Sequence, residues 1–187
     1  MTASRNPKHL GFLIFPGFPM ACLTSAIEPL RAANEITGQR AFRWSVLSEN
    51  GARVAPSAEV VFDPTMALSE AAGLDCLFFL SSQSGWFDAP KKALAELRWL
   101  ARQGVGMGGF SGGSFPLVRA GLMEGHAVSV HWCYEAAFKA EFPKIDARSA
   151  VMSIDQSRMT AAGATAVFDL MLKLIEDDLG PEVMTEV

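Results

Sequence analysis

The sequence MGGFSGGS at residues 107–114 has the residue types and spacing best suited to chemistry in this chain. Gly109, Ser111 and Gly113 match the pattern G-x-S-x-G, a sharp turn between a strand and a helix that exposes a serine hydroxyl. Glycines allow the tight turn without Cβ clashes, and the N–H groups at the start of the helix favour negative charge. The pattern predicts either nucleophilic chemistry or anion binding at Ser111.

A serine nucleophile needs a base, and the chain offers three histidines: His9, His126 and His131. Hydrolases of the α/β-hydrolase fold place an acid and then a histidine well downstream of the serine. Both later histidines lie within 20 residues of Ser111, which argues against that fold. His131, at the end of the next predicted strand, instead predicts that Ser111 and His131 lie at the C-terminal ends of neighbouring strands. Open α/β sheets bind ligands at that position.

Strand and helix patterns alternate along the whole chain. Continuous apolar or glycine-rich runs predict strands buried on both faces at 10–15, 42–47, 76–80 and 104–110. A short strand is predicted at 127–130, just before His131, and a strand pair at 151–154 and 159–162. Helical patterns cover 21–34, 90–102, 112–121, 132–142 and 164–179. Pro29 is expected to kink the first helix or delay its start. We predict one domain over residues 1–187, an α/β, flavodoxin-like three-layer sandwich with a mostly parallel sheet and helices on both faces.

Composition and charge narrow the function. The chain has 187 residues, of which 50% are hydrophobic and 19% charged, enough apolar material for a two-sided core. Its net charge of −4 argues against nucleic-acid binding by this chain, because DNA-binding surfaces need clustered lysine and arginine.

Its three cysteines, Cys22, Cys76 and Cys133, lack metal-ligand spacing and suit a reducing cytosol. We therefore expect no metal and no cofactor. The mostly polar residues 2–9 predict no signal peptide, and no apolar run reaches the roughly 20 residues of a membrane span, so we expect a cytoplasmic protein without membrane contact.

Several segments, taken in order, resemble a known family. They are PGF at 16–18, AIEPLRAAN at 26–34, GG at 108–109, RAGL at 119–122, HW at 131–132, FP at 142–143, and TAAG at 160–163 followed by Asp169. Together they resemble the N-terminal domain of GlxA-type regulators of the AraC family, a ThiJ/PfpI (class I glutamine amidotransferase-like) domain. The resemblance implies a homodimeric sensor of a small metabolite, such as an amino acid or a quaternary amine. It also implies that DNA is bound only through a C-terminal helix-turn-helix domain, which is missing from this chain.

The chain departs from the family pattern at three places. Ser111 stands where many relatives have a cysteine, Pro19 where catalytic members carry an acid, and Ser81-Ser82 where paired glycines often help form an oxyanion hole. A serine hydroxyl needs a general base, and no acid is evident to orient His131. We therefore expect a binding site rather than an active site. The expected ligand-binding residues are Pro19, Ser81, Ser82, Trp86, Ser111, Gly112 and His131.

Plainer alternatives stay open for these residues. Ser111 and His131 are also the pair that a small hydrolase or hydratase would use, and a chaperone-like or structural dimer is a third possibility. Ser111 can equally be a small residue in a tight turn, and His131 can cap a neighbouring backbone group. Trp86 follows a strand in a polar loop, which favours a position lining a pocket. Trp132 is expected to pack in the core, and Cys133 to have no catalytic role.

Overall fold

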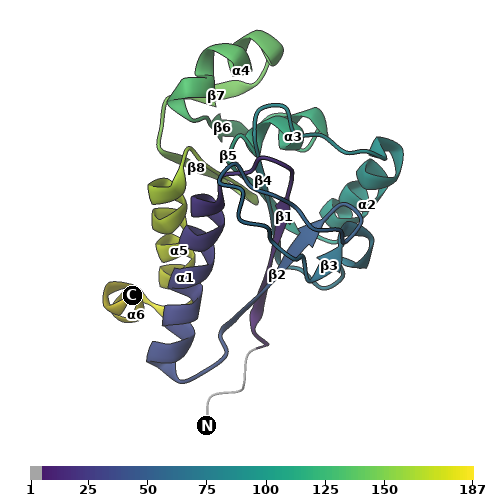
Figure 1. Ribbon diagram of the computed structural model, residues 1–187. Coiled ribbons are helices and arrows are strands. Elements are labelled where there is room, and N and C mark those ends of the chain that lie inside the picture. The colour runs from purple at the N-terminus through teal and green to yellow at the C-terminus, as the bar shows by residue number, and fades with distance from the viewer. Residues whose placement is uncertain (1–5) are drawn as a thin grey trace.

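The computed structural model describes residues 6–187; residues 1–5, part of the polar segment that predicts no signal peptide, lie outside it. Its centre is a seven-stranded sheet with the order β3-β2-β1-β4-β5-β9-β8 (Figure 1). All neighbours in the sheet are parallel except β8 and β9, which are antiparallel. The strands are β1 (Lys8–Ile14), β2 (Phe42–Ser48), β3 (Met66–Ala67), β4 (Cys76–Ser81), β5 (Gly106–Ser111), β8 (Met152–Asp155) and β9 (Arg158–Ala161).

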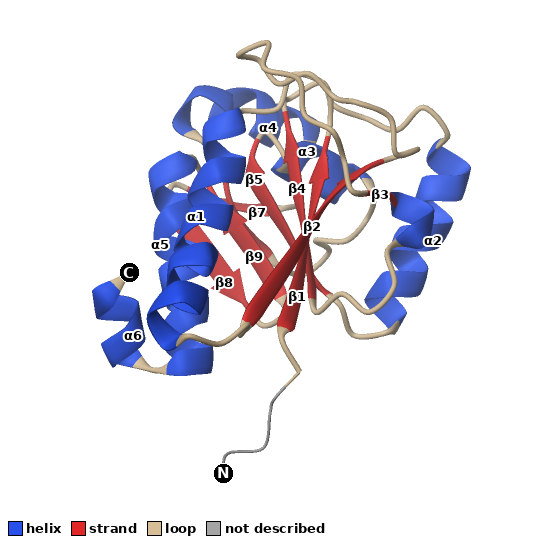
Figure 2. Cartoon of the chain, turned by 60° about the horizontal axis from the view of Figure 1, so that its bottom comes forward, coloured by secondary structure: helices blue, strands red, loops and turns tan. Residues whose placement is uncertain are grey.

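Helices cover both faces of this sheet, as Figure 2 shows. Helices α1 (Met20–Thr37) and α5 (Ala164–Leu179) pack together on one face, and the short α6 (Pro181–Glu186) packs against them. Helices α2 (Pro90–Arg102) and α3 (Ser114–Arg119) lie on the other face. The predicted three-layer α/β sandwich with a mostly parallel sheet is confirmed. None of the helices within residues 6–187 is long and apolar enough to span a membrane.

Alternate side chains of the central strands pack into two separate hydrophobic cores, one on each face of the sheet. Phe12 and Phe78 pack under α1 and α5, whereas their neighbours Leu13 and Phe79 pack under α2 and α3. The ring of Phe78 stacks on Phe110 with centroids 4.7 Å apart. Each such side chain contributes about 1.5–3 kcal/mol when it leaves water. Burial on both faces explains why these strands read as continuous apolar runs.

Two predicted helices differ in detail from the structure. Helix α1 already begins at Met20 and contains Pro29, so the predicted late start is wrong. Pro29 removes only one backbone donor, and the residue is buried within the helix. The predicted 132–142 helix is a 3₁₀ turn, η2 (Trp132–Tyr134), followed by α4 (Glu135–Glu141).

Strands β6 (Ala127–Ser129) and β7 (Asp146–Arg148) form a separate parallel pair. We call residues 127–148, with η2 and α4, the small lobe; Figure 1 shows it at the top of the molecule, above β5 and β8. The N–H of Ser129 donates to Oγ1 of Thr160 at 2.7 Å, and the N–H of Ala127 donates to Asp155 at 3.1 Å. These bonds fasten the small lobe to β8 and β9.

Candidate functional site

Ser111 ends β5 in a left-handed backbone conformation with φ of 53°. Among the described residues that are not glycine, only Glu59 and Gln156 share a positive φ. This conformation costs an L-residue about 1–2 kcal/mol. It is the sharp turn that the G-x-S-x-G pattern predicts, and such strain at a sheet's C-terminal edge is a feature of functional sites.

The glycines after Ser111 let this turn pack against the end of β4. Ser81 and Ser111 are register partners of β4 and β5. A Cβ at Gly112 would lie 2.5 Å from the carbonyl oxygen of Ser81, and one at Gly113 only 1.9 Å from that of Phe79. Because backbone occupies this space, no side chain other than hydrogen fits at either position.

The hydroxyl of Ser111 has no hydrogen-bond partner among the residues that the structure describes, although the residue is only 8% exposed. The Ser111 oxygen is nevertheless not fully buried. Within the described chain, the one fully buried side-chain polar atom without a hydrogen-bond partner is Nδ1 of His126. The small exposed part of Ser111 therefore leaves its oxygen in contact with solvent. A hydroxyl held in this way can donate to or accept from a bound molecule.

His131 does not follow a strand next to β5. Strand β6, which precedes it, pairs with β7, while the neighbours of β5 are β4 and β9. The prediction that Ser111 and His131 end neighbouring strands is therefore wrong, because β9 takes the place beside β5. The ring of His131 instead lies against the backbone at Gly163, directly after β9, where an added Cβ would be 3.4 Å from its Cδ2 atom.

The hydrogen bonding of His131 bears on its use as a base. Its Nδ1 accepts from the N–H of Cys133 at 3.3 Å, so it caps η2. With that lone pair occupied, the neutral ring carries its proton on Nε2 and has no free acceptor. No carboxylate of the described chain hydrogen-bonds the ring. None of these hydrogen bonds links His131 to Ser111.

A cavity of about 450 Å³ opens beside the turn. It is lined by Ser82, Gln83, Ser84, Arg119 and Tyr134. The loop that forms one wall touches the turn, because a Cβ at Gly112 would lie 2.6 Å from the carbonyl carbon of Ser82. The oxygens of Ser82 and Ser84 are 3.2 Å apart and present a hydroxyl pair.

Arg119 holds the walls of this cavity together. Its Nε and Nη2 donate to both carboxylate oxygens of Glu141 at 2.7 and 2.9 Å. Its Nη1 donates to the carbonyl oxygens of Gln83 and Gly85 at 3.0 and 3.1 Å. The guanidinium is thereby neutralised and joins α3, the loop after β4, and α4. The cavity presents hydroxyl and amide groups instead of a free cation.

Three other residues predicted to bind a ligand, Ser81, Pro19 and Trp86, differ in burial and do not line the cavity. Ser81 is fully buried and its hydroxyl donates to the carbonyl oxygen of Ser82 at 2.8 Å. Pro19 is half-buried at the N-cap of α1. Trp86 packs against the core with its ring edge-on to Phe87, with centroids 5.3 Å apart, and is not part of the cavity lining.

Trp132 contradicts the prediction of core packing, because it is 81% exposed. The single 3₁₀ turn that carries it presents no buried face. Its ring lies near that of His131, with centroids 5.5 Å apart. Sequence reasoning also missed Gln83, Ser84, Arg119 and Tyr134 as cavity residues; the conspicuous RAGL segment was the one available signal, and it did not reveal the partner Glu141.

The cysteines occupy unremarkable positions. Cys22 and Cys76 are buried, and burial raises the pKa of the Cys22 thiol to about 12 and that of Cys76 to about 11. Both therefore stay protonated and unreactive. Cys133 is exposed at the start of η2. Within residues 6–187, no three His, Cys, Asp or Glu side chains gather to hold a metal ion.

Comparison with known proteins finds relatives that are similar to nearly the whole chain. The chain is 35% identical over 184 residues to the HTH-type transcriptional regulator GbdR of Pseudomonas aeruginosa, covering 98% of this chain and 50% of GbdR. It is 32% identical to the HTH-type transcriptional regulator GlxA of Rhizobium meliloti, covering 98% of this chain and 57% of GlxA. No family model matches the chain.

Two solved structures agree with these relatives. An AraC family transcriptional regulator from Pseudomonas putida superposes with a TM-score of 0.83 at 26% identity, covering 96% of both chains. A ThiJ/PfpI family protein from Pseudomonas syringae superposes with a TM-score of 0.78 at 21% identity, covering 96% of this chain and 72% of that one. The chain is a ThiJ/PfpI-fold domain related to GlxA-type regulators.

This ThiJ/PfpI-fold domain spans about half the length of the curated relatives that it matches. Its relation to them rests on similarity along nearly the whole chain.

Proposed function

We propose that this chain is the ligand-sensing domain of a GlxA-type, AraC-family transcription regulator and binds a small metabolite in the cavity beside Ser111. The observation that carries the proposal is the similarity, over 98% of the chain, to two proteins named as HTH-type transcriptional regulators. Binding rather than catalysis at the turn is supported by the strained Ser111 with its unbonded hydroxyl. The cavity volume of about 450 Å³ lies within the range typical of small-molecule sites.

The lining favours a small polar or zwitterionic ligand, such as an amino acid or a quaternary amine. Ser82, Ser84 and Gln83 offer neutral donors and acceptors, and Tyr134 offers an aromatic face. Because Arg119 is already bonded to Glu141, a bound anion gains no free cation here. Of the seven predicted ligand-binding residues, only Ser82 lines this cavity. Pro19, Trp86, Gly112 and His131 remain proposed contacts from outside its lining.

The rival function is a small hydrolase or hydratase that uses Ser111 and His131. It is disfavoured because Nδ1 of His131 accepts a hydrogen bond, which leaves the neutral ring no lone pair for the serine proton. Esterase assays with p-nitrophenyl acetate separate the two functions. We expect no turnover that depends on Ser111; turnover that disappears in Ser111→Ala would replace the sensing proposal.

Partners follow from the same proposal. With a net charge of −4, this domain is not expected to bind DNA, which a separate helix-turn-helix segment would contact in the cytoplasm. Homodimerisation would bring two such segments together. Gel-shift and light-scattering experiments on this chain should give a dimer without DNA affinity; a monomer, or strong DNA binding by this chain, would contradict this part.

Calorimetry against a panel of amino acids and betaines tests the binding site. We expect one class of ligand to bind, and Ser111→Ala or Ser82→Ala to weaken it about fivefold each, since a net hydrogen bond is worth about 1 kcal/mol. Ser157→Ala, in the turn between β8 and β9, is the matched control and should not change affinity. No binding by any member, or equal affinity in all three variants, would refute the site.

A further inference from the structure

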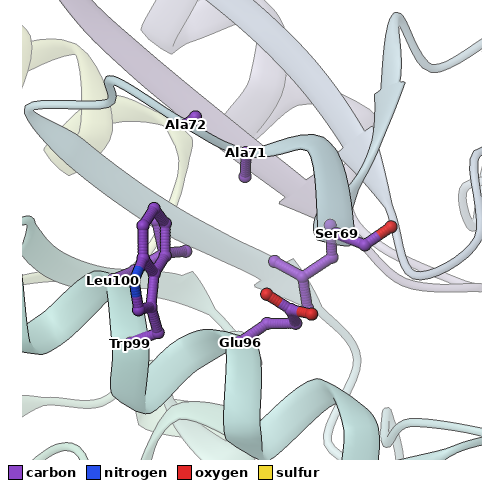
Figure 3. Close-up of a pocket in the computed structure, with 7 residues that line it drawn as sticks. Ser69, Ala71, Ala72, Glu96, Trp99 and Leu100 are labelled. Carbon is purple, nitrogen blue, oxygen red and sulfur yellow. The ribbon is translucent and has the colours of Figure 1, made fainter.

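A second cavity lies between α2 and the 3₁₀ turn η1 (Leu68–Glu70) (Figure 3). Its volume is about 270 Å³, and it shares no residue with the cavity beside Ser111. The lining residues are Leu68, Ser69, Ala71, Ala72, Glu96, Trp99 and Leu100. We call this cavity the α2 groove. Nothing in the sensing proposal uses it.

The α2 groove has an apolar floor and one aromatic wall. Leu68, Ala71 and Leu100 are almost fully buried in the core beneath it. Trp99 is 41% exposed, which is unusual for so large an apolar side chain, and Figure 3 shows its indole ring standing at one end of the groove. An apolar chain lying here would cover both the floor and part of the exposed indole.

Glu96 adds a charge to this apolar surface. It precedes Trp99 by three residues on α2, so both side chains lie on the same face of the helix. Its carboxylate forms no hydrogen bond or ion pair with any residue in the described range 6–187, and Lys92, one turn earlier, does not reach it. Glu70, the last residue of η1, does not line the groove, and its carboxylate accepts from the N–H of Ala67 at 2.7 Å. Glu96 is therefore the charged lining residue of the groove whose carboxylate has no partner within the described residues.

We propose that the α2 groove binds an organic cation that bears N–H donors on a short apolar chain, namely an alkylammonium or alkylguanidinium group. The N–H groups donate to Glu96 in charge-assisted hydrogen bonds. The cation faces the Trp99 ring, whose π-system attracts positive charge. The alkyl chain covers Leu68 and Leu100. An anion would be repelled by Glu96, and a neutral apolar ligand would desolvate that carboxylate without compensating it.

Fluorine NMR on protein labelled with 5-fluorotryptophan tests the proposal, with n-butylguanidinium as the probe. The four tryptophans give four resonances, and Trp99→Phe identifies the one in the groove. We expect that resonance to shift saturably while those of Trp86 and Trp132 stay unchanged. A shift at those tryptophans instead, or none at all, would overturn the proposal.

Charge and hydrogen bonding are tested separately. Glu96→Gln should weaken n-butylguanidinium about fivefold, as expected for a partly solvated ion pair worth about 1 kcal/mol. The control is Glu124→Gln, an exposed carboxylate in the turn between α3 and β6, which should leave binding unchanged. The unshifted tryptophan resonances verify that each variant is folded. Equal binding by Glu96→Gln, or by the neutral probe 1-butanol, would refute the role of the charge.

Two further probes define the ligand. Butyltrimethylammonium has the charge but no N–H donor and should bind more weakly than n-butylguanidinium; equal or tighter binding would refute the hydrogen bonds to Glu96. A blocked Gly-Arg-Gly peptide presents the same group as part of a protein. Tighter binding of the peptide would assign the groove to an arginine side chain of a partner, and tighter binding of n-butylguanidinium to a free small molecule.

Discussion

Replacing Ser111 with glycine tests whether the backbone of the folded domain is strained at this turn without a compensating hydrogen bond from the serine hydroxyl. An L-residue at φ of 53° costs about 1–2 kcal/mol relative to its preferred conformations, whereas glycine bears no such cost. Glycine in turn gives the unfolded chain about 0.5–1 kcal/mol more conformational entropy. The hydroxyl has no partner in the described structure, so its removal costs little. Ser111→Gly should therefore stabilise the domain by about 0.5–1 kcal/mol.

Urea denaturation followed by circular dichroism measures this gain, and thermal melting should give an increase in Tm of about 2–3 °C for a domain of this size. Gln156→Gly is a matched control, since Gln156 has φ of 57° in the exposed turn between β8 and β9. Both variants should gain stability by the same mechanism. Only Ser111→Gly should lose affinity for the ligand proposed for the cavity beside Ser111.

A loss of more than about 0.5 kcal/mol in Ser111→Gly, with the expected gain in Gln156→Gly, would refute this reasoning. It would mean that the serine hydroxyl is bonded within the folded chain. The turn would then be a structural feature, and the proposal that its hydroxyl is reserved for a ligand would fail.

Three other predictions follow from the structure. A double-mutant cycle of Arg119→Met and Glu141→Gln in urea should give a coupling energy of about 1 kcal/mol, because the bidentate pair is partly exposed to solvent; a coupling near zero would contradict its role. Gly113→Ala should destabilise the domain by more than about 3 kcal/mol or give insoluble protein, because its Cβ would lie 1.9 Å from the oxygen of Phe79; a folded variant with wild-type melting would refute the close approach. Burial lowers the pKa of His9 below its ordinary value of 6.5, so the unfolded chain binds the proton first as pH falls. The free energy of unfolding should thus be highest above about pH 6.5 and decrease below it, and His9→Gln should flatten this slope between about pH 7.5 and about pH 5.5 in urea titrations.

Much of the main sheet could be predicted because burial on both faces leaves a local signal. The continuous runs around Phe12 and Phe78 are strands in the structure, and the glycine-rich run before Ser111 is β5. The turn at Ser111 could also be predicted, since its glycines are required by backbone contacts and are visible as a pattern. These features depend on residues close together in the chain.

The rest of the site depends on contacts between distant segments. Nothing near Arg119 in the sequence indicates that Glu141, 22 residues later, binds it, or that the carbonyl oxygen of Gln83 completes the set. The position of His131 was predicted wrongly for the same reason, because strand order is decided by β9, which occurs later in the chain. Trp132 was misplaced because apolar character alone does not distinguish a buried from an exposed aromatic side chain.

The four hydrogen bonds of Arg119 have a mechanical consequence. The guanidinium is rigid and planar, so the loop after β4 and helix α4 cannot move apart without breaking charge-assisted bonds. If the loop moves, either α4 and the following β7 move with it, or the hydrogen bonds between Arg119 and Glu141 break. Either event alters the outer surface of the protein at a distance from the loop. Through its four hydrogen bonds, Arg119 thus links the position of the loop after β4 to that of α4.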